Sequence, residues 1–168
     1  MSSKTDYTAA EWALLSEMPL KVAIGATIIE VDSEGLGGGE REMLAAMKEI
    51  AAAEEGFAEN DLIQAVLREL KAEPGEDGDA REIEVPGGEA WTALIDDLLD
   101  RARETTALLA AKSTPEEADD FKRWLLNIAG QAATATESGG FLGIGGERVS
   151  DQEKTFLREL AAALGVST

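Results

Sequence analysis

The chain contains no cysteine and no histidine. These absences exclude disulfides, thiol nucleophiles, imidazole bases and Ser-His-Asp triads. A metal site would have to consist of oxygen ligands, which are typical of Ca²⁺, Mg²⁺ or Mn²⁺. No pair of carboxylates stands in surroundings that would give its two members opposite acid and base roles. We therefore expect a protein that is not an enzyme.

Basic residues are scarce, with 15 lysines and arginines against 34 acids and a formal net charge of −19. Phosphate backbones and anionic membrane surfaces would repel such a chain, and no basic cluster offsets the charge. We expect no nucleic-acid and no membrane partner, but a divalent cation or another protein. The longest apolar-leaning stretch, Met18 to Val31, is too short to span a bilayer, and no basic-then-apolar leader begins the chain. A cytoplasmic location is the corresponding expectation.

Aromatic residues make up only 5% of the chain, so alanine, leucine and isoleucine must fill most of a core. Side chains of this kind lose little rotamer freedom in a helix. Apolar residues recur at helical spacing along almost the whole sequence and are expected to face the core. Examples are Trp91, Leu94, Ile95, Leu98 and Leu99, and again Phe156, Leu157, Leu160 and Leu164. The prediction is an all-α protein in which residues 1–168 form a single bundle of about seven helices. These are expected near 8–17, 19–31, 39–55, 59–71, 88–112, 115–136 and 150–164.

Three of the expected helices begin with a capping box, in which a hydroxyl residue precedes a glutamate by three positions. The pairs are Thr8 with Glu11, Thr114 with Glu117, and Ser150 with Glu153. By contrast, residues 72–88 are dense in glycine, proline and acids. They are expected to form an exposed loop inside the one bundle.

The order helix, acidic glycine-rich loop, helix occurs twice, at residues 22–47 and 128–160. This layout indicates either a duplicated unit or two solutions to one packing problem. The second copy carries Val149-Ser150-Asp151-Gln152-Glu153, and the first has Val31-Asp32 followed by Glu40 or Glu42. In these segments the chain resembles the tellurite-resistance TerB-like helical proteins. The resemblance implies an all-helical bundle, divalent-cation binding by clustered acids, and a setting of tellurite or stress resistance.

The first acidic loop offers Glu30, Asp32, Glu34, Glu40 and Glu42 as oxygen ligands. Counted from Glu30, acids occupy EF-hand positions 1, 3 and 5, but Arg41 stands at position 12, where a bidentate glutamate belongs. An irregular cation site and a simple complement to a helix dipole both remain open. The second loop offers Glu137, Glu147, Asp151 and Glu153, the last also explained by its cap. The predicted metal ligands are Glu30, Asp32, Glu34, Glu40, Glu137, Asp151 and Glu153.

The second loop, "GGFLGIGG", also holds three apolar residues, Phe141, Leu142 and Ile144. They either pack into the bundle or form an exposed patch for a protein partner. The loop lacks the Gly-Lys-Ser/Thr ending of a phosphate-binding P-loop. Two functions follow as hypotheses. The first is a non-enzymatic TerB-like domain that binds a divalent cation weakly; the alternative is an interaction or scaffold module acting through an exposed helix face or this patch.

Overall fold

The computed structural model describes residues 3–29, 38–72, 90–135 and 149–166, and these residues form helices and no strand. The all-α prediction is therefore confirmed for the described residues. They comprise one short 3₁₀ helix, η1 (Lys4–Asp6), and six α-helices. The α-helices are α1 (Ala9–Ile28), α2 (Gly38–Gly56), α3 (Asp61–Lys71), α4 (Ala90–Lys112), α5 (Pro115–Thr134) and α6 (Asp151–Ala163).

The six α-helices of the described residues are close to the predicted number of about seven, and the difference arises because the first two expected helices are continuous. Helix α1 runs through Pro19, where a break was expected. A proline inside a helix costs about 3 kcal/mol. Leu15, Met18 and Val22 lie on one face of α1 and are 0% exposed, and burying each such side chain contributes roughly 1.5–3 kcal/mol. Packing on both sides of the proline thus outweighs its local cost.

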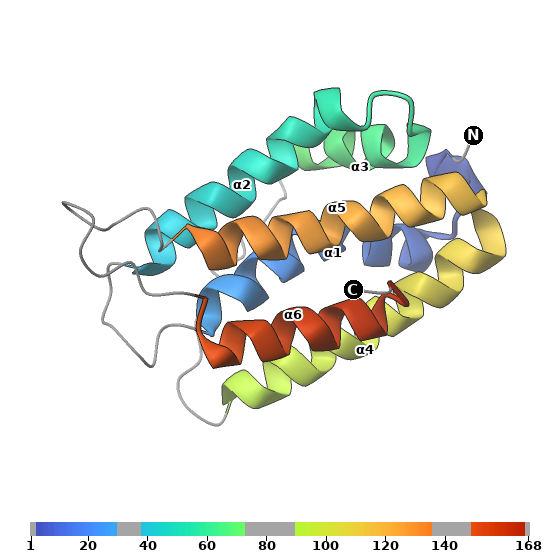
Figure 1. The fold of residues 1–168 in the computed structure, drawn as a ribbon. Coiled ribbons are helices and arrows are strands. Elements are labelled where there is room, and N and C mark those ends of the chain that lie inside the picture. The colour runs from blue at the N-terminus through green and yellow to red at the C-terminus, as the bar shows by residue number, and fades with distance from the viewer. Residues whose placement is uncertain (1–2, 30–37, 73–89, 136–148, 167–168) are drawn as a thin grey trace.

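Helices α1 and α5 lie in the middle of the bundle (Figure 1). Helices α2 and α3 pack on one side of this central pair, and α4 and α6 pack on the other. Within the central pair, Phe121 and Trp124 of α5 meet edge to face, with ring centroids 5.7 Å apart. This edge-to-face geometry is the one that aromatic quadrupoles favour.

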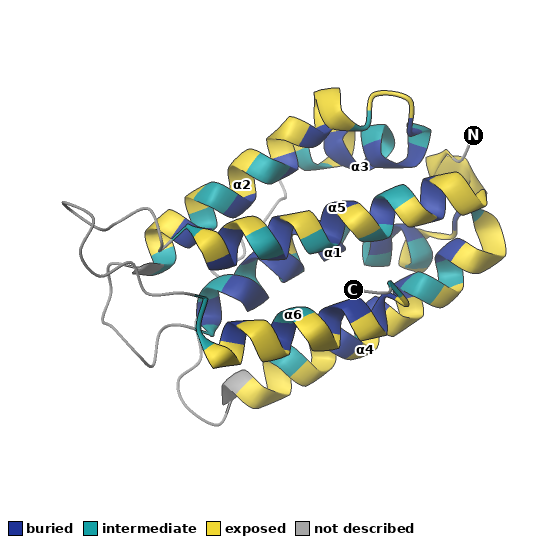
Figure 2. Cartoon of the chain, viewed as in Figure 1, coloured by how far each residue is buried: buried dark blue, intermediate teal, exposed yellow. Residues whose placement is uncertain are grey.

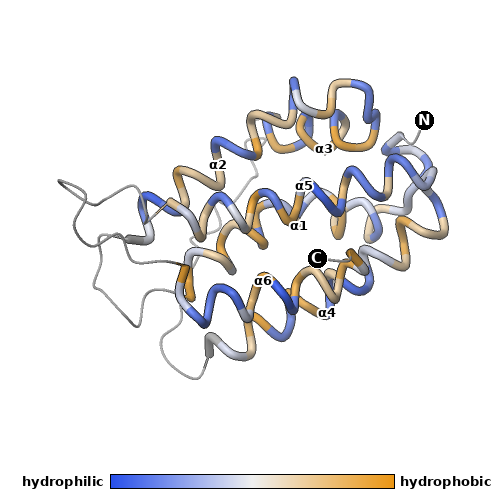
Figure 3. Tube along the Cα trace, viewed as in Figure 1, coloured by the Kyte–Doolittle hydropathy of each residue, from blue (hydrophilic) through white to orange (hydrophobic). Residues whose placement is uncertain are grey.

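Buried and exposed positions alternate around each helix, as Figure 2 shows. Hydrophobic and hydrophilic residues alternate along the chain in the same way (Figure 3). The fully buried aliphatic and aromatic side chains come from α1, α3, α4, α5 and α6, and α2 contributes mainly Ala46, Ile50 and Ala53. Small residues on α1 and α5, among them Ala23, Ala26, Ala129 and Ala132, are also buried. The helical periodicity of the sequence therefore marks most of the core-facing positions, but Leu94, which was expected on the inner face of α4, is 37% exposed.

All three predicted capping boxes are present. The hydroxyls of Thr8, Thr114 and Ser150 accept hydrogen bonds from the backbone three residues later. A fourth cap was not predicted: the side-chain oxygen of Asn60 accepts from Ile63 N–H at 3.1 Å, and its amide donates to the Glu117 carbonyl at 3.3 Å. Asn60 is 3% exposed. This side chain both begins α3 and joins it to α5.

One end of the bundle gathers five helix termini. The last turns of α1 and α5 and the first turns of α2, α4 and α6 lie there (Figure 1). In the sequence, residues 30–37 and 136–148 connect four of these termini, and residues 73–89 precede the first turn of α4; all three ranges lie outside the described residues. The acidic connections of the duplicated unit and most of the expected loop at 72–88 belong to these ranges, so the duplication stays a prediction.

Candidate functional site

The predicted metal ligands divide into two groups. Glu30, Asp32, Glu34 and Glu137 lie outside the described residues. Of the other three, Glu40 is exposed in the first turn of α2, and Asp151 is exposed at the first position of α6. Within the described ranges, no group of three acidic side chains is close enough together to hold a metal ion.

Two of the predicted ligands on α6 have local structural roles. Lys154 Nζ lies 3.1 Å from Asp151 Oδ1, so that carboxylate already has a counter-ion on its own helix. Glu153 is 1% exposed, and its carboxylate accepts a hydrogen bond from the Ser150 N–H at 2.6 Å. The Glu153 N–H in turn donates to Ser150 Oγ at 3.2 Å. These contacts are the reciprocal bonds of the capping box.

Glu42, considered with the first loop, is a buried residue of α2 with 0% exposure. It lies on the same face as Ala46, Ile50 and Ala53, which are also buried. The burial of Glu42 could not be predicted from the sequence, because it depends on which face of α2 packs against the bundle. The predicted docking residues Phe141, Leu142 and Ile144 lie outside the described residues.

The structure places a groove where α1, α4 and α6 meet, at the end of the bundle described above. Its volume is about 690 Å³, within the range of roughly 300–1,000 Å³ that is usual for ligand sites. We call it the α1–α4–α6 groove. The described residues that line it are Ile28, Ile29, Thr92, Ile95, Asp96, Asp151, Gln152, Thr155, Phe156 and Glu159.

The floor of this groove is apolar, and Ile28, Ile95 and Phe156 supply it from three different helices. Ile28 and Phe156 are 8% and 4% exposed. Beneath them, Gly25 lets the helices approach closely: a Cβ at Gly25 would lie 2.5 Å from Leu98 Cδ2 and 3.5 Å from Phe156 Cζ. Because Gly25 has no side chain, α4 and α6 can pack closely on α1, and their side chains form the floor of the groove.

The rim of the α1–α4–α6 groove is acidic. Asp96 lies on α4, while Asp151 and Glu159 lie two turns apart on α6, and all three are exposed. No lysine or arginine is among the described residues that line it. Ile95 and Phe156 were predicted as core-face residues, but their combination with these acids was missed. Nothing in the sequence indicates that α4 and α6 lie side by side on α1.

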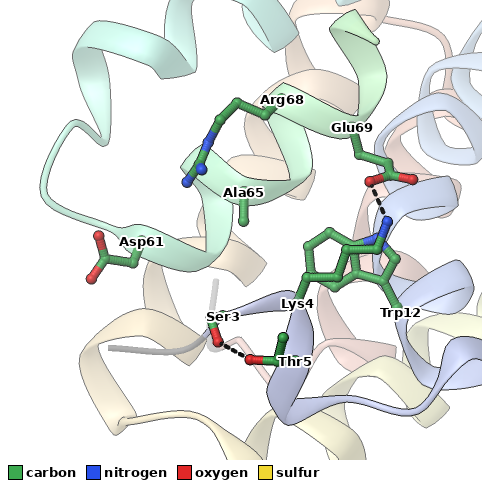
Figure 4. Close-up of a pocket in the computed structure, with 8 residues that line it drawn as sticks. All are labelled: Ser3, Lys4, Thr5, Trp12, Asp61, Ala65, Arg68 and Glu69. Carbon is green, nitrogen blue, oxygen red and sulfur yellow. Dashed lines mark hydrogen bonds and ion pairs between the residues drawn. The ribbon is translucent and has the colours of Figure 1, made fainter.

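A second hollow of about 540 Å³ lies between η1, α1 and α3 (Figure 4). There Lys4 Nζ is 2.8 Å from Glu69 Oε2 and 5.7 Å from the centroid of the Trp12 ring. The hydrogen bond from Lys4 lowers the pKa of Glu69 from its ordinary value of 4.5. Lys4 therefore has both an acidic and an aromatic partner in its own chain. We interpret the contacts of Lys4 in this hollow as structural, because they hold η1 against α1 and α3.

A parallel contact joins the other side of η1 to the end of α4. Lys112 Nζ is 2.6 Å from Glu11 Oε2 and 5.7 Å from the centroid of the Tyr7 ring. Tyr7 and Ser113 share a hydrogen bond of 2.9 Å between their hydroxyls. The hydrogen bond from Lys112, followed by that from the Thr8 N–H, lowers the pKa of Glu11 from 4.5 to about 2. Both contacts attach the N-terminal segment to the bundle.

In the part of the chain that the structure describes, no helix combines the length and the hydropathy needed to cross a membrane. Comparisons with protein-family models, with curated proteins and with solved structures found no match for this chain.

Proposed function

We propose that this protein is a non-enzymatic interaction module that holds a cationic amphipathic segment of a partner protein in the α1–α4–α6 groove. One observation carries the proposal: the groove combines an apolar floor from three helices with a rim of three exposed carboxylates. Apolar side chains of the partner would lie on the floor. Its lysines or arginines would meet Asp96 and Glu159, and would share Asp151 with Lys154.

The charge of the protein and the shape of the groove both favour a cationic amphipathic helix as the partner. The net charge of −19 attracts cationic proteins over long range and raises their association rate. An amphipathic helix laid into an apolar groove is a common mode of peptide recognition. Rim charges contribute mainly to the rate and specificity of binding, and the desolvated apolar anchors supply most of the affinity.

A labelled synthetic helical peptide, with leucines along one face and lysines at its margins, tests the proposal by fluorescence anisotropy. We expect Asp96→Lys with Glu159→Lys to weaken its binding at least about tenfold. The matched control, Glu104→Lys with Asp119→Lys, reverses two exposed carboxylates outside the groove and changes the net charge equally. It should leave most of the affinity in place.

Three results would overturn this proposal. The wild-type protein could fail to bind the peptide, the control variant could lose as much affinity as the groove variant, or a scrambled peptide of the same composition could bind equally well. The second and third results would mean that only the net charge attracts the peptide.

Weak divalent-cation binding in a tellurite-resistance setting is our second hypothesis. It depends on the resemblance to TerB-like proteins and on carboxylates of which Glu30, Asp32, Glu34 and Glu137 lie outside the described residues. Hard cations need several oxygen ligands, so the two acidic loops would have to act together. Thermal unfolding in the presence of Ca²⁺, Mg²⁺ or Mn²⁺ tests this hypothesis independently of the groove.

A further inference from the structure

Helix α2 exposes apolar side chains on the face that points away from the bundle. Leu44 is 56% exposed and Met47 is 43% exposed, the two highest values among the exposed large hydrophobic residues of the described chain. They are one turn apart. Arg41 and Lys48, also exposed, lie one turn to either side of Leu44. We call Arg41, Leu44, Met47 and Lys48 the outer face of α2.

The two bases of this face differ from the other described lysines and arginines in the contacts that they make. Nine lysines and arginines in the described residues lie within ion-pair distance of a carboxylate: Lys4, Lys21, Lys71, Arg101, Arg103, Lys112, Lys122, Arg123 and Lys154. Arg68 and Arg158 donate hydrogen bonds within their own helices. Arg41 and Lys48 have neither kind of contact with another described residue. Within the described part of the chain, these two charges are therefore left to meet an outside partner.

The outer face of α2 complements the α1–α4–α6 groove of the same protein. Seven residues separate Arg41 from Lys48, so the two charges are about 10 Å apart along α2. Eight residues separate Asp151 from Glu159, which places these acids about 12 Å apart along α6. In both surfaces apolar side chains lie between or beside the charges. One surface is a protruding helix face that carries two bases, and the other is an acidic groove.

The two surfaces lie on opposite sides of the bundle. Helix α2 packs against α1, α3 and α5, whereas α4 and α6 lie across the central pair from it (Figure 1). A chain therefore could not place its own α2 in its own groove without unfolding. A contact between the two surfaces must join different molecules.

We propose that the outer face of α2 from one copy docks in the α1–α4–α6 groove of a second copy. The inference rests on the proposed function, since it names one occupant of the groove assigned there. Such a head-to-tail contact leaves one surface of each kind free at the ends of the assembly. It therefore grows into a ring or an open chain rather than stopping at a symmetric dimer.

Repulsion between copies opposes this contact, because each chain carries a net charge of −19. Salt screens the repulsion at distances beyond the Debye length, about 8 Å at physiological ionic strength. The apolar contact at Leu44 and Met47 does not depend on screening in this way. We therefore expect association to be weak and to strengthen as salt is raised from very low to physiological concentration.

Sedimentation velocity over a wide range of protein concentration tests the inference with two variants. The face variant carries Arg41→Glu with Lys48→Glu, and the groove variant carries Asp96→Lys with Glu159→Lys. We expect the wild-type mass to rise with concentration and each variant alone to associate at least about tenfold more weakly. An equal mixture should associate again, because the intact face fits the intact groove and the reversed charges of the two mutated surfaces also attract each other.

Arg68→Glu with Lys71→Glu on α3 is the matched control for the face variant, and Glu104→Lys with Asp119→Lys is the control for the groove variant. Neither control should reduce association beyond the effect of net charge. The inference is overturned if the wild type stays monomeric, if a control disrupts association equally, or if the mixture does not associate. A monomeric wild type whose groove still binds the lysine–leucine peptide leaves the proposed function standing and removes only self-docking. Loss of both peptide binding and association removes both.

Discussion

Replacing Gly25 with alanine tests two opposing contributions to the free energy of unfolding, the gain in helix propensity and the steric cost at a close helix contact. Gly25 lies in the interior of α1, where alanine is intrinsically favoured over glycine by about 1 kcal/mol. A Cβ at Gly25 would lie 2.5 Å from Leu98 Cδ2, and Leu98 is only 4% exposed. Adding a methyl group to a packed core of this kind costs typically about 1–3 kcal/mol. We expect Gly25→Ala to be neutral at best and to destabilise the protein by up to about 2 kcal/mol.

Gly130 is the matched control, because it lies in the interior of α5 and gains the same propensity. Apart from the backbone of its own helix, no described atom lies within 4 Å of a Cβ placed there. Gly130→Ala should therefore stabilise the protein by about 0.5–1 kcal/mol. The difference between the two variants, about 1–3 kcal/mol, measures the steric cost at the floor of the groove.

Equilibrium unfolding in urea, followed by tryptophan fluorescence, measures both variants. Trp12 and Trp124 are 5% and 0% exposed, so their emission reports the loss of the core. In a thermal experiment each kcal/mol corresponds to a shift of about 2–4 °C for a chain of this size. Equal stabilisation by Gly25→Ala and Gly130→Ala would refute the close approach of α1, α4 and α6 on which the groove depends.

Three further predictions concern the cap, the pH dependence and the cations. Ser150→Ala removes the acceptor for the Glu153 N–H and should lower the free energy of unfolding, measured in urea, by about 1 kcal/mol. Thr155→Ala, at an exposed position of the same helix, should not lower it, and equal losses in the two variants would contradict the role of the cap. The pKa of Glu11 is lowered from 4.5 to about 2, so its contribution to stability is fully present above pH 4.5 and is lost as the pH falls toward 2. Unfolding measured across this window should depend less on pH in Glu11→Gln than in the wild type, and an unchanged slope would contradict the contact with Lys112. Millimolar Ca²⁺, Mg²⁺ or Mn²⁺ should raise the unfolding midpoint relative to chelator if the acidic loops bind a cation; no shift with any of the three would remove that hypothesis.

Local sequence features predicted the helices well, because they depend on neighbours along the chain. Apart from the two expected helices that merge in α1, the ends of the α-helices lie within two residues of those predicted. The capping boxes at Thr8, Thr114 and Ser150 mark three of these starts. The cap at Asn60 was missed because Ile63, rather than a glutamate, stands three positions later, so no capping box marks it; only its second contact, with the Glu117 carbonyl, is tertiary. The break expected near residue 18 is absent although Pro19 lies there, because the cost of a proline is local while the burial that offsets it is tertiary.

The candidate site could be predicted from the sequence pattern to a much smaller extent than the helices. Asp151 and Glu153 were chosen as ligands for their place beside a glycine-rich loop, but one pairs with Lys154 and the other caps α6. Ile95 and Phe156 were expected to be core residues. They become the floor of a groove because Gly25 allows α4 and α6 to meet on α1.

Composition and periodicity alone determined that this is an acidic chain without thiol or imidazole chemistry, and that its described residues are helical. Those properties follow from which residues are present and from their spacing along a single helix. Only the tertiary structure decided which carboxylates share a rim and which apolar residues form its floor. It also decided which bases have no acid beside them among the described residues. These properties depend on the packing of helices far apart in sequence, since a side chain's partners are set by the helices beside it.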